Sequence, residues 1–295
     1  CGGDAEVNGN NKEYVAYVFA HDDQSFGTNS DEAIIKCGSY TGAANTTKSV
    51  SLGFEPQWVM IKNISRASDS YGNADWFMAD IMREMCQLNA RALRANTTDS
   101  EYNGGRVVPT TTGFNIVNED NIDHSTNGDT YIYMAIRRPN KPPTAGTDVF
   151  AANVQTSPNY FKTFPTGFPV DLSILYDRDS TRDKYWFDRL RGGSAFGLES
   201  TTTDSESQAS SIEFDRQTAL YEKIGFATSN LLLHAFRRAP GFFDIVAYDG
   251  TGSTTAHNHN LGVTPELLIV KNRTHPLGYT FLGWPVYNSA DGASE

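Results

Sequence analysis

An internal repeat constrains the fold of this chain more than any other feature of its sequence. A glycine turn leads into a short apolar run at residues 53–63, and the same landmarks return in the same order at residues 167–177 and 262–272. Three copies in one order are hard to attribute to chance. The sequence therefore indicates a series of related units rather than one continuous domain.

Further landmarks follow the glycine turns in the same order. Residues 93–101 and 198–206 share the pattern Leu-x-x-x-Thr-Thr-Asp-Ser-Glu, and an apolar stretch that ends in Arg-Arg closes each unit at residues 131–138 and 231–238. A similar closing stretch at residues 14–20 has no unit ahead of it. The closing stretches recur about every hundred residues, which is the size of a compact domain.

These landmarks predict four segments in a chain that we interpret as part of something longer. They are the closing strand of a preceding module at 1–22, a β-sandwich module at 31–139, a more divergent β-sandwich module at 144–239, and the truncated start of a further module at 240–295.

The residue types within the repeats favour strands. Short runs rich in Val, Ile, Phe and Tyr are bounded by Gly, Asn, Thr and Pro, which is typical of strands joined by turns. Residues 58–61 are continuously apolar and are expected to be buried on both faces. Residues 77–95 have apolar spacings that fit either a helix or a loop with a short helical turn. We predict an all-β fold of tandem β-sandwiches of the jelly-roll type.

Charge and cysteine content exclude several classes of protein. The net charge of −11 would repel a phosphate backbone, so no nucleic-acid partner is expected. No apolar run approaches the ~20 residues of a membrane span, and no membrane insertion is predicted. The spacing of Cys1, Cys37 and Cys86 fits neither a disulfide framework nor a zinc site, and their state is not predicted.

The order of the motifs resembles a known family. A Tyr-Thr-Gly strand precedes Leu-Gly-Phe-x-Pro at residues 52–56 and Ile-Lys-Asn at residues 61–63, with a further match at residues 261–273. Together these motifs resemble the laminin-G/concanavalin-like modules repeated in tail and virion proteins of marine tailed bacteriophages. The middle copy departs most, because Tyr176 and Asp177 replace Lys-Asn. The resemblance implies a structural or adhesive role and a location on the virion or outside the cell.

Two tryptophans in polar surroundings are the candidate ligand-binding residues. Folds of the concanavalin type sometimes bind sugars on an aromatic platform beside Asn and Asp. Trp76 with Asp75 and Trp186 with Asp183 could form such a glycan platform, although tryptophan is as often a core residue in these sandwiches. Trp58 and Trp284 are expected in the core or at contacts between modules.

One other repeated pattern is more easily explained by structure than by ligand binding. A recurring Asp-x-x-Arg, formed by Asp80 with Arg83 and by Asp188 with Arg191, favours a structural ion pair or a capped turn over a ligand site.

A pair of histidines is a weak candidate for metal binding. His257 and His259 would share one face of a strand and could chelate a transition metal, but no third ligand is evident and a solvated loop is favoured. No cofactor is predicted, and no residue pattern argues for calcium.

The sequence carries no assembled catalytic motif, so we predict a non-enzymatic protein. The expected function is a structural or adhesion protein of a bacteriophage particle, such as a tail fibre, spike or other appendage. Its expected partners are other virion proteins, copies of itself in a homo-oligomer, and host-surface glycans. Two alternatives remain open: glycan-binding accessory modules of a larger polysaccharide-degrading enzyme, and a bacterial surface lectin anchored through a lipid on Cys1.

Overall fold

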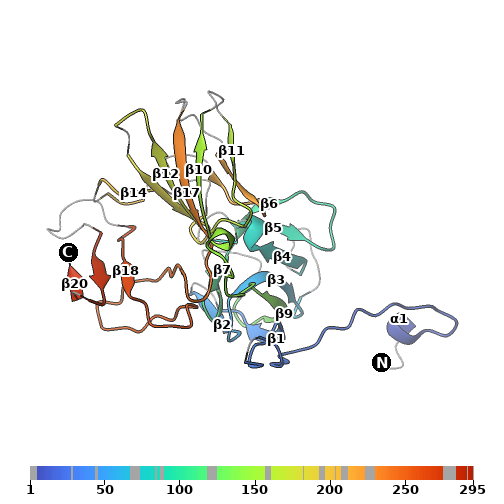
Figure 1. Cartoon of the computed structure of the whole chain (residues 1–295). Helices are drawn as coiled ribbons and strands as arrows, with labels where there is room; N and C mark the ends of the chain where they lie inside the picture. The colour runs from blue at the N-terminus through green and yellow to red at the C-terminus, as the bar shows by residue number, and fades with distance from the viewer. Residues whose placement is uncertain are drawn as a thin grey trace.

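A computed structural model describes most of the chain (Figure 1). The described residues are 5–27, 29–43, 46–66, 74–83, 85–86, 90–117, 125–156, 161–181, 183–192, 197–202, 204–206, 212–222, 230–274, 284–290 and 292–294. These residues are nearly all in strands, turns and extended segments, and the all-β prediction is confirmed. The helical elements are one turn each: α1 (Ala5–Asn8), η1 (Ile81–Arg83) and η2 (Gly146–Asp148).

The first sandwich consists of two antiparallel sheets. Its larger sheet has the order β1-β9-β3-β4-β5-β6, and its smaller sheet has the order β2-β8-β7. The strands are β1 (Ile35–Thr41), β2 (Lys48–Ser51), β3 (Pro56–Asn63), β4 (Trp76–Asp80), β5 (Ala90–Arg94), β6 (Tyr102–Gly105), β7 (Val107–Thr110), β8 (Gly113–Ile116) and β9 (Thr130–Arg137).

The second sandwich repeats this strand order. Its larger sheet has the order β10-β17-β12-β13-β14, and its smaller sheet has the order β11-β16-β15. The strands are β10 (Phe150–Gln155), β11 (Lys162–Pro165), β12 (Leu172–Asp177), β13 (Tyr185–Asp188), β14 (Leu198–Glu199), β15 (Ile212–Glu213), β16 (Ala219–Glu222) and β17 (Leu231–Phe236). In both sandwiches the closing strand, β9 or β17, lies between the first strand and the strand after the glycine turn.

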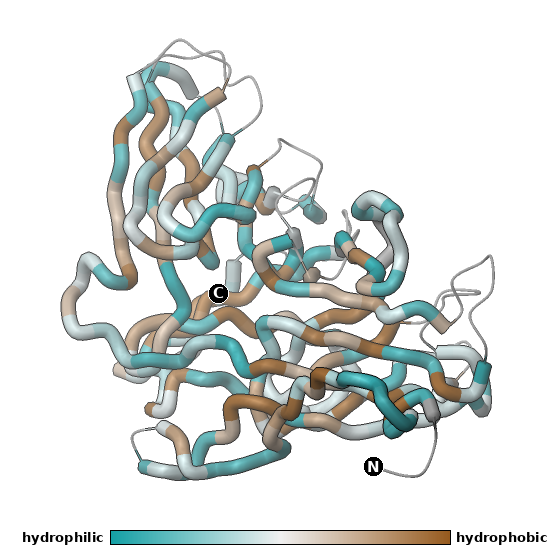
Figure 2. The backbone as a smooth tube through the Cα atoms, turned by 90° about the vertical axis from the view of Figure 1, so that its right-hand side faces the viewer, coloured by the Kyte–Doolittle hydropathy of each residue, from teal (hydrophilic) through white to brown (hydrophobic). Residues whose placement is uncertain are grey.

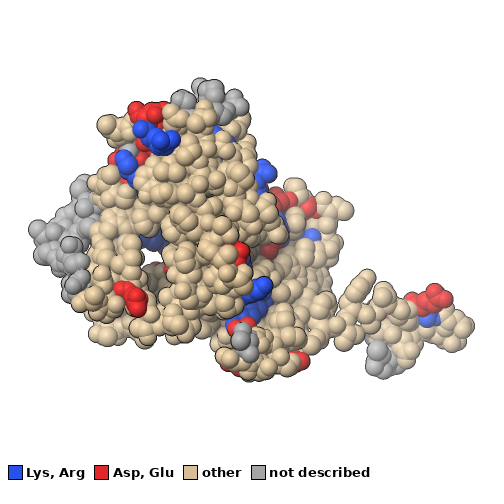
Figure 3. Space-filling view, viewed as in Figure 1, with Lys and Arg blue, Asp and Glu red and all other residues tan. Residues whose placement is uncertain are grey.

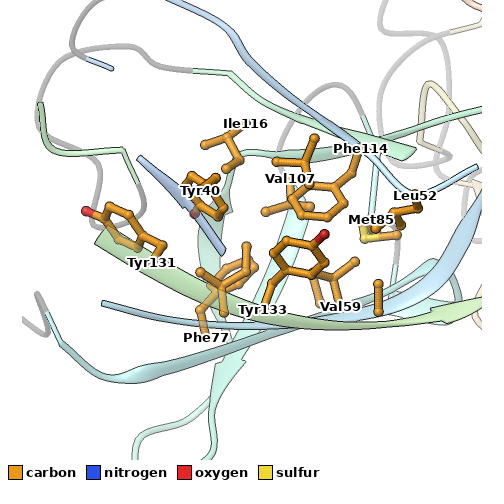
Figure 4. Packing of buried hydrophobic residues seen from close by; sticks show 14 of the residues in the cluster. Tyr40, Leu52, Val59, Phe77, Met85, Val107, Phe114, Ile116, Tyr131 and Tyr133 are labelled. Carbon is orange, nitrogen blue, oxygen red and sulfur yellow. The ribbon is translucent and has the colours of Figure 1, made fainter. Parts of the chain in front are cut away.

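Each sandwich has its own core between its two sheets. In the first, Val59 and Tyr133 from the larger sheet face Phe114 and Ile116 from the smaller one, and all four are buried (Figure 4). The second core joins, among others, Leu175, Phe187, Leu231 and Leu233 to Phe164, Ile212 and Leu220. Hydrophobic stretches coincide with many of the strands (Figure 2). Because side chains alternate along a strand, one face of each sheet is buried and the other faces outward.

The repeated glycine is explained by its backbone conformation. Gly53, Gly167 and Gly262 have φ angles of 79°, 81° and 71°, a region that favours glycine. The Gly53 N–H donates to the carbonyl of Thr112 at 2.9 Å, and the Gly167 N–H donates to the carbonyl of Thr218 at 3.1 Å. The same turn therefore starts the same strand in each copy.

The repeated Asn or Asp at the end of the following strand also has a structural role. Its side-chain oxygen accepts a hydrogen bond from the backbone N–H two residues later, at 2.8 Å for Asn63, 3.0 Å for Asp177 and 3.0 Å for Asn272. A hydrogen bond of this kind stabilises a tight turn at the end of the strand. The replacement of Asn by Asp in the middle copy preserves this bond.

A third, smaller sheet follows the second sandwich. It has the order β18-β19-β20 and contains β18 (Leu267–Ile269), β19 (Val286–Asn288) and β20 (Gly292–Ser294). Leu267, Leu268 and Ile269 are 58%, 43% and 45% exposed, whereas the equivalent strands β3 and β12 are buried on at least one face.

Three local expectations differ from the structure. Residues 14–20, expected to form a strand, are extended but belong to no strand, because no described segment of the chain pairs with them. Along residues 58–61, Val59 and Ile61 are buried while the two residues between and before them are half-buried, because β3 packs on one face only. The described part of residues 77–95 forms two strands around η1 and has no longer helix.

Candidate functional site

In each larger sheet the recurring Asp-x-x-Arg stabilises the turn after the fourth strand, which is β4 in the first sandwich and β13 in the second. The backbone N–H of Arg83 donates to Asp80 Oδ1 at 2.9 Å, and its Nε lies 2.6 Å from Asp80 Oδ2. Arg191 makes the same two bonds with Asp188, and its Nη2 also donates to the carbonyl of Trp186. The prediction of a structural ion pair with a capped turn is confirmed.

Trp76 lies on the outer face of the first sandwich and is half-buried. The ammonium of Lys62, opposite it on β3, lies 5.2 Å from the centroid of its ring and donates to the carbonyl of Ala74 at 2.8 Å. Beside the ring, Asp75 Oδ1 accepts a hydrogen bond from Asn96 at 2.7 Å. One ring face is thus covered by a long surface side chain, and a polar rim flanks it.

Trp186 has different surroundings, although it too is half-buried. Its ring contacts the ring of Trp284 with centroids 5.0 Å apart. This contact connects the second sandwich to the segment that carries β19. Asp183 accepts a hydrogen bond from the hydroxyl of Thr201. The counterpart of Trp76 is Trp284, because Lys271 lies over the ring of Trp284 as Lys62 lies over that of Trp76.

Asp183 also lies close to a second carboxyl group. Burial has the largest effect on the pKa of Glu199 and raises it, and the charges of Asp183 and Asp204 raise it further. A hydrogen bond with Tyr185 acts in the opposite direction. A pair of neighbouring carboxyl groups, one of them with a raised pKa, is an arrangement that glycoside hydrolysis uses. If the chain had catalytic activity, this pair beside Trp186 is where it would be expected.

The two histidines lie in an exposed segment. The ring of His257 stacks on Tyr248 with centroids 4.1 Å apart, and His259 Nδ1 accepts a hydrogen bond from the backbone N–H of Leu261 at 3.3 Å. Among the residues that the structure describes, no group of three or more His, Cys, Asp and Glu side chains could hold a metal ion. These two residues therefore have local partners within their own segment.

A buried charge cluster joins the two sandwiches, and the sequence did not indicate it. The guanidinium of Arg238 binds both carboxylate oxygens of Glu55, with Nη1–Oε2 and Nη2–Oε1 distances of 3.0 and 2.8 Å. The equivalent Arg138 binds Asp171 at 3.2 Å and the carbonyl of Arg238 at 2.9 Å. The Arg238 and Glu55 side chains are 1% and 4% exposed, so the pair is shielded from water.

The charges in this cluster are mutually compensated. Burial alone would raise the pKa of Asp171, but the guanidinium groups of Arg138, Arg238 and Arg189 outweigh it and lower that pKa to about 2. Burial would likewise lower the pKa of Arg238, whereas Glu55, Asp171 and Asp244 raise it. Asp171 and Arg238 therefore stay ionised at neutral pH. A buried charge of this kind is stable only while its partners remain in place.

Arg189 extends this joint from the second sandwich. Its Nη1 donates to the carbonyl of Ile81 at 2.9 Å, and its Nη2 donates to the carbonyl of Val170 at 2.7 Å. It thus connects η1 of the first sandwich to the strand start of the second. Sequence reasoning stopped at the ion pair of its neighbours Asp188 and Arg191 and gave Arg189 no role.

A cavity of about 200 Å³ lies beside this cluster. Residues 108–111 of the first sandwich, the Glu55–Arg238 pair and residues 245–247 line it, together with His257. Glu55 and Arg238 already satisfy each other here, so they offer little charge to a ligand. The cavity is better explained as an imperfectly filled contact than as a binding pocket.

Comparison with known proteins places only part of the chain. Residues 1–139 match the model of a family described as a domain of unknown function (DUF7483). No curated protein and no solved structure matches the chain. The matched region contains the N-terminal segment and the whole first sandwich, and it ends shortly after β9. Within the described residues, no helix has the length and apolar character needed to cross a bilayer.

Proposed function

We propose that this chain is a non-enzymatic structural or adhesion component of a bacteriophage particle, such as a tail fibre, spike or other appendage. The observation that carries the proposal is the buried cluster around Arg238, which joins two sandwiches of the same strand order. A flexible linker would let the units tumble independently. Ion pairs shielded from water instead hold one unit against the next, as an extended appendage requires.

The surface suits this role better than a role on nucleic acid. Acidic and basic side chains lie in small mixed groups over a largely uncharged face (Figure 3). The net charge of the whole chain is −11. Tandem units of one strand order place their loops at regular intervals along a chain, and symmetric particles convert weak contacts into avidity.

Host-surface glycans are the ligands that we propose for the outer face around Trp76. A sugar ring could stack on the indole after displacing the Lys62 ammonium, while Asp75 and Asn96 would supply polar contacts at the rim. Trp186 is a weaker candidate than sequence reasoning suggested, because Trp284 already packs against it.

The experiment is a binding assay of the whole chain on glycan arrays and on host cells, with and without calcium. Trp76→Ala is expected to weaken glycan binding at least tenfold, and Trp186→Ala is the matched tryptophan control on the other sandwich. Loss of binding in both variants alike, with both still folded, would argue against a platform at Trp76. If the unaltered chain binds neither glycans nor host cells, a purely architectural role is the remaining interpretation.

The same glycans separate this proposal from the enzymatic alternative. A binding protein releases no new reducing ends from a polysaccharide, whereas a glycoside hydrolase does. We expect no release by the unaltered chain. Release that disappears in a Glu199→Gln variant would contradict the proposal and assign hydrolysis to the Asp183–Glu199 pair.

A further inference from the structure

The second sandwich has an open sheet edge at a position that the first sandwich covers. In the first, the outermost strand of the larger sheet is β1, and a preceding segment of the chain occupies its outer side. The Ile35 carbonyl accepts from the Asp22 N–H at 2.9 Å. The Cys37 N–H donates to His21 Nδ1 at 3.1 Å. In the second sandwich β10 takes the place of β1, and no described segment of the chain covers its outer side.

The residues that cover β1 have no counterpart that could reach β10. The residues that stand equally far before β10 are Ile136 and Arg137, and they form the end of β9. There they pair with strands of the first sandwich. The open edge therefore belongs to a complete sandwich inside the chain, and the sequence on both sides of it is present.

Alternate residues of β10 direct their backbone groups to this edge. The Val149 carbonyl accepts from the Arg237 N–H at 2.8 Å, so every second residue after Val149 bonds to β17. In an antiparallel ladder the residues between them point their N–H and C=O groups the opposite way. Phe150, Ala152 and Val154 therefore present backbone donors and acceptors to the open edge, where the described part of the chain supplies no partner.

The strand lacks the features that normally protect an edge. Proteins block exposed edges with charged side chains, prolines, bulges or a covering segment. β10 contains no charged residue and no proline, and its pairing with β17 runs without a register shift. Phe150 and Val154 are 38% and 46% exposed, and Ala152 is exposed between them. An uncharged, apolar edge of this kind readily pairs with another strand.

The neighbouring strand β11 leaves this edge accessible. It lies beside β10 in Figure 1, but it pairs with β16 in the smaller sheet. The side-chain amides of Asn153 and Gln155 connect the two strands, because they donate to the carbonyls of Pro165 and Thr163 at 2.5 and 2.8 Å. Side chains alternate along a strand, so these two lie on the face opposite to the exposed residues of β10. β11 is therefore on the inner side of β10.

The edge of β10 is complementary to the same edge of a second copy. If two such strands pair antiparallel about a two-fold axis at Ala152, Phe150 of each copy lies opposite Val154 of the other. Pairs of an aromatic and a β-branched side chain across strands are favourable. All of these residues direct their backbone groups to the edge, so both hydrogen bonds of each pair can form. The contact also brings no charges together, although the chain has a net charge of −11.

We propose that two copies of the chain form a dimer through their β10 strands, paired antiparallel about a two-fold axis at Ala152. The larger sheets of the two second sandwiches then become one continuous sheet. Because the same strand contributes from both copies, the interface is isologous and closes at the dimer. This interface goes beyond the proposed particle and glycan function and does not rest on it.

The test is sedimentation velocity of the whole chain over a range of concentrations, with charges placed at the two-fold axis. Ala152→Lys and Ala152→Glu each put like charges opposite one another in a dimer, whereas a mixture of the two variants puts opposite charges together. The matched controls are Ser39→Lys and Ser39→Glu, because Ser39 is the exposed counterpart of Val154 on β1. Circular dichroism checks that all variants are folded.

The unaltered chain and both controls are expected to be in equilibrium between monomer and dimer, with nothing larger. Ala152→Lys and Ala152→Glu should each dimerise about tenfold more weakly or worse, and their equimolar mixture should recover the dimer. The Ala152 amide should exchange slowly in the dimer and rapidly on dilution, while the Ala151 amide, which faces β17, stays protected. A chain that is monomeric at all concentrations, charged variants that dimerise as the unaltered chain does, or a mixture that stays monomeric would overturn the proposal.

Discussion

The two sandwiches have the same strand order but different interiors. The first buries tyrosines, with the rings of Tyr40 and Tyr131 stacked at 5.0 Å. The second has Leu231 and Leu233 at the strand positions of Tyr131 and Tyr133. It also buries Lys162 with Glu222 at the strand positions that Lys48 and Ile116 occupy in the first.

The two sandwiches share the residues that determine the backbone conformation at their turns. The positive-φ glycine, the Asn or Asp turn and the Asp-x-x-Arg lock recur, while the side chains between the sheets have changed in size and charge. A core tolerates replacement when volume and pattern are kept, whereas a positive φ or a specific turn bond admits few residues. The repeat is therefore visible in its turns more than in its core.

The largest expected effect comes from breaking the joint between the units. Arg238→Met should lower the free energy of unfolding by about 3–5 kcal/mol, because it leaves Glu55 buried without its charged partner and removes one of the three arginines around Asp171. Urea unfolding monitored by tryptophan fluorescence measures the change. Arg237→Met, on the neighbouring half-buried residue, is the control and should cost far less. Equal losses in the two variants would show that the joint contributes no special stability.

The buried pair of the second sandwich should tolerate replacement by two apolar residues. Glu222→Ile alone leaves Lys162 buried beside an apolar side chain and is expected to cost about 3 kcal/mol. Adding Lys162→Met should recover most of that loss in the same urea experiment. A double variant as unstable as the single one would mean that this site does not accept an apolar pair.

Acid should affect the second sandwich through a carboxylate that the first does not have. Asp171 takes the strand position of Gln57, and its pKa in the folded chain is lowered from 3.8 to about 2. Its stabilisation is therefore present above pH 4 and is lost as the pH falls toward 2, by about 2 kcal/mol.

Unfolding free energies measured from pH 6 down to pH 2 test this prediction. Asp171→Asn should be less stable at pH 6 and should lose less stability over that range than the unaltered chain. Parallel pH profiles for the two proteins would contradict the assignment.

The smallest effect separates the two copies of the Asp-x-x-Arg lock. Asp188 and Arg191 are buried, whereas Asp80 and Arg83 are half-buried. Asp188→Ala should therefore cost about 2–3 kcal/mol, and Asp80→Ala about 1 kcal/mol, because a half-buried arginine can regain contact with water when its partner is removed. Thermal unfolding of the two variants gives the ranking, and the reverse order would contradict it.

Sequence reasoning found the features that depend on neighbouring residues. The matches between residues 131–138 and 231–238 identified equivalent strands, and the Asp-x-x-Arg spacing identified a capped turn. For residues 77–95 it left a helix or a loop with a short helical turn open; the short turn is present as η1, but the two strands that flank it were not predicted, because apolar spacings over a short stretch fit a helix as well as strands.

Contacts between residues far apart in the sequence could not be predicted from the sequence alone. Glu55 and Arg238 are 183 positions apart, and neither stands in a local motif that names its partner. The contact of Trp186 with Trp284 is of the same kind, so one sequence could not separate a sugar platform from a packing contact. Residues 14–20 show the converse, because a strand pattern forms no strand without a neighbour.

The central claim is that one sandwich plan, with the closing strand enclosed between two others, occurs twice in this chain. Amide hydrogen exchange of the unaltered chain at low concentration tests it most directly. We expect β9 and β17 to be among the slowest-exchanging segments, while residues 14–20, with a similar pattern, exchange rapidly. Rapid exchange in β17, or equal protection of residues 14–20, would show that the closing strand is not enclosed in both sandwiches.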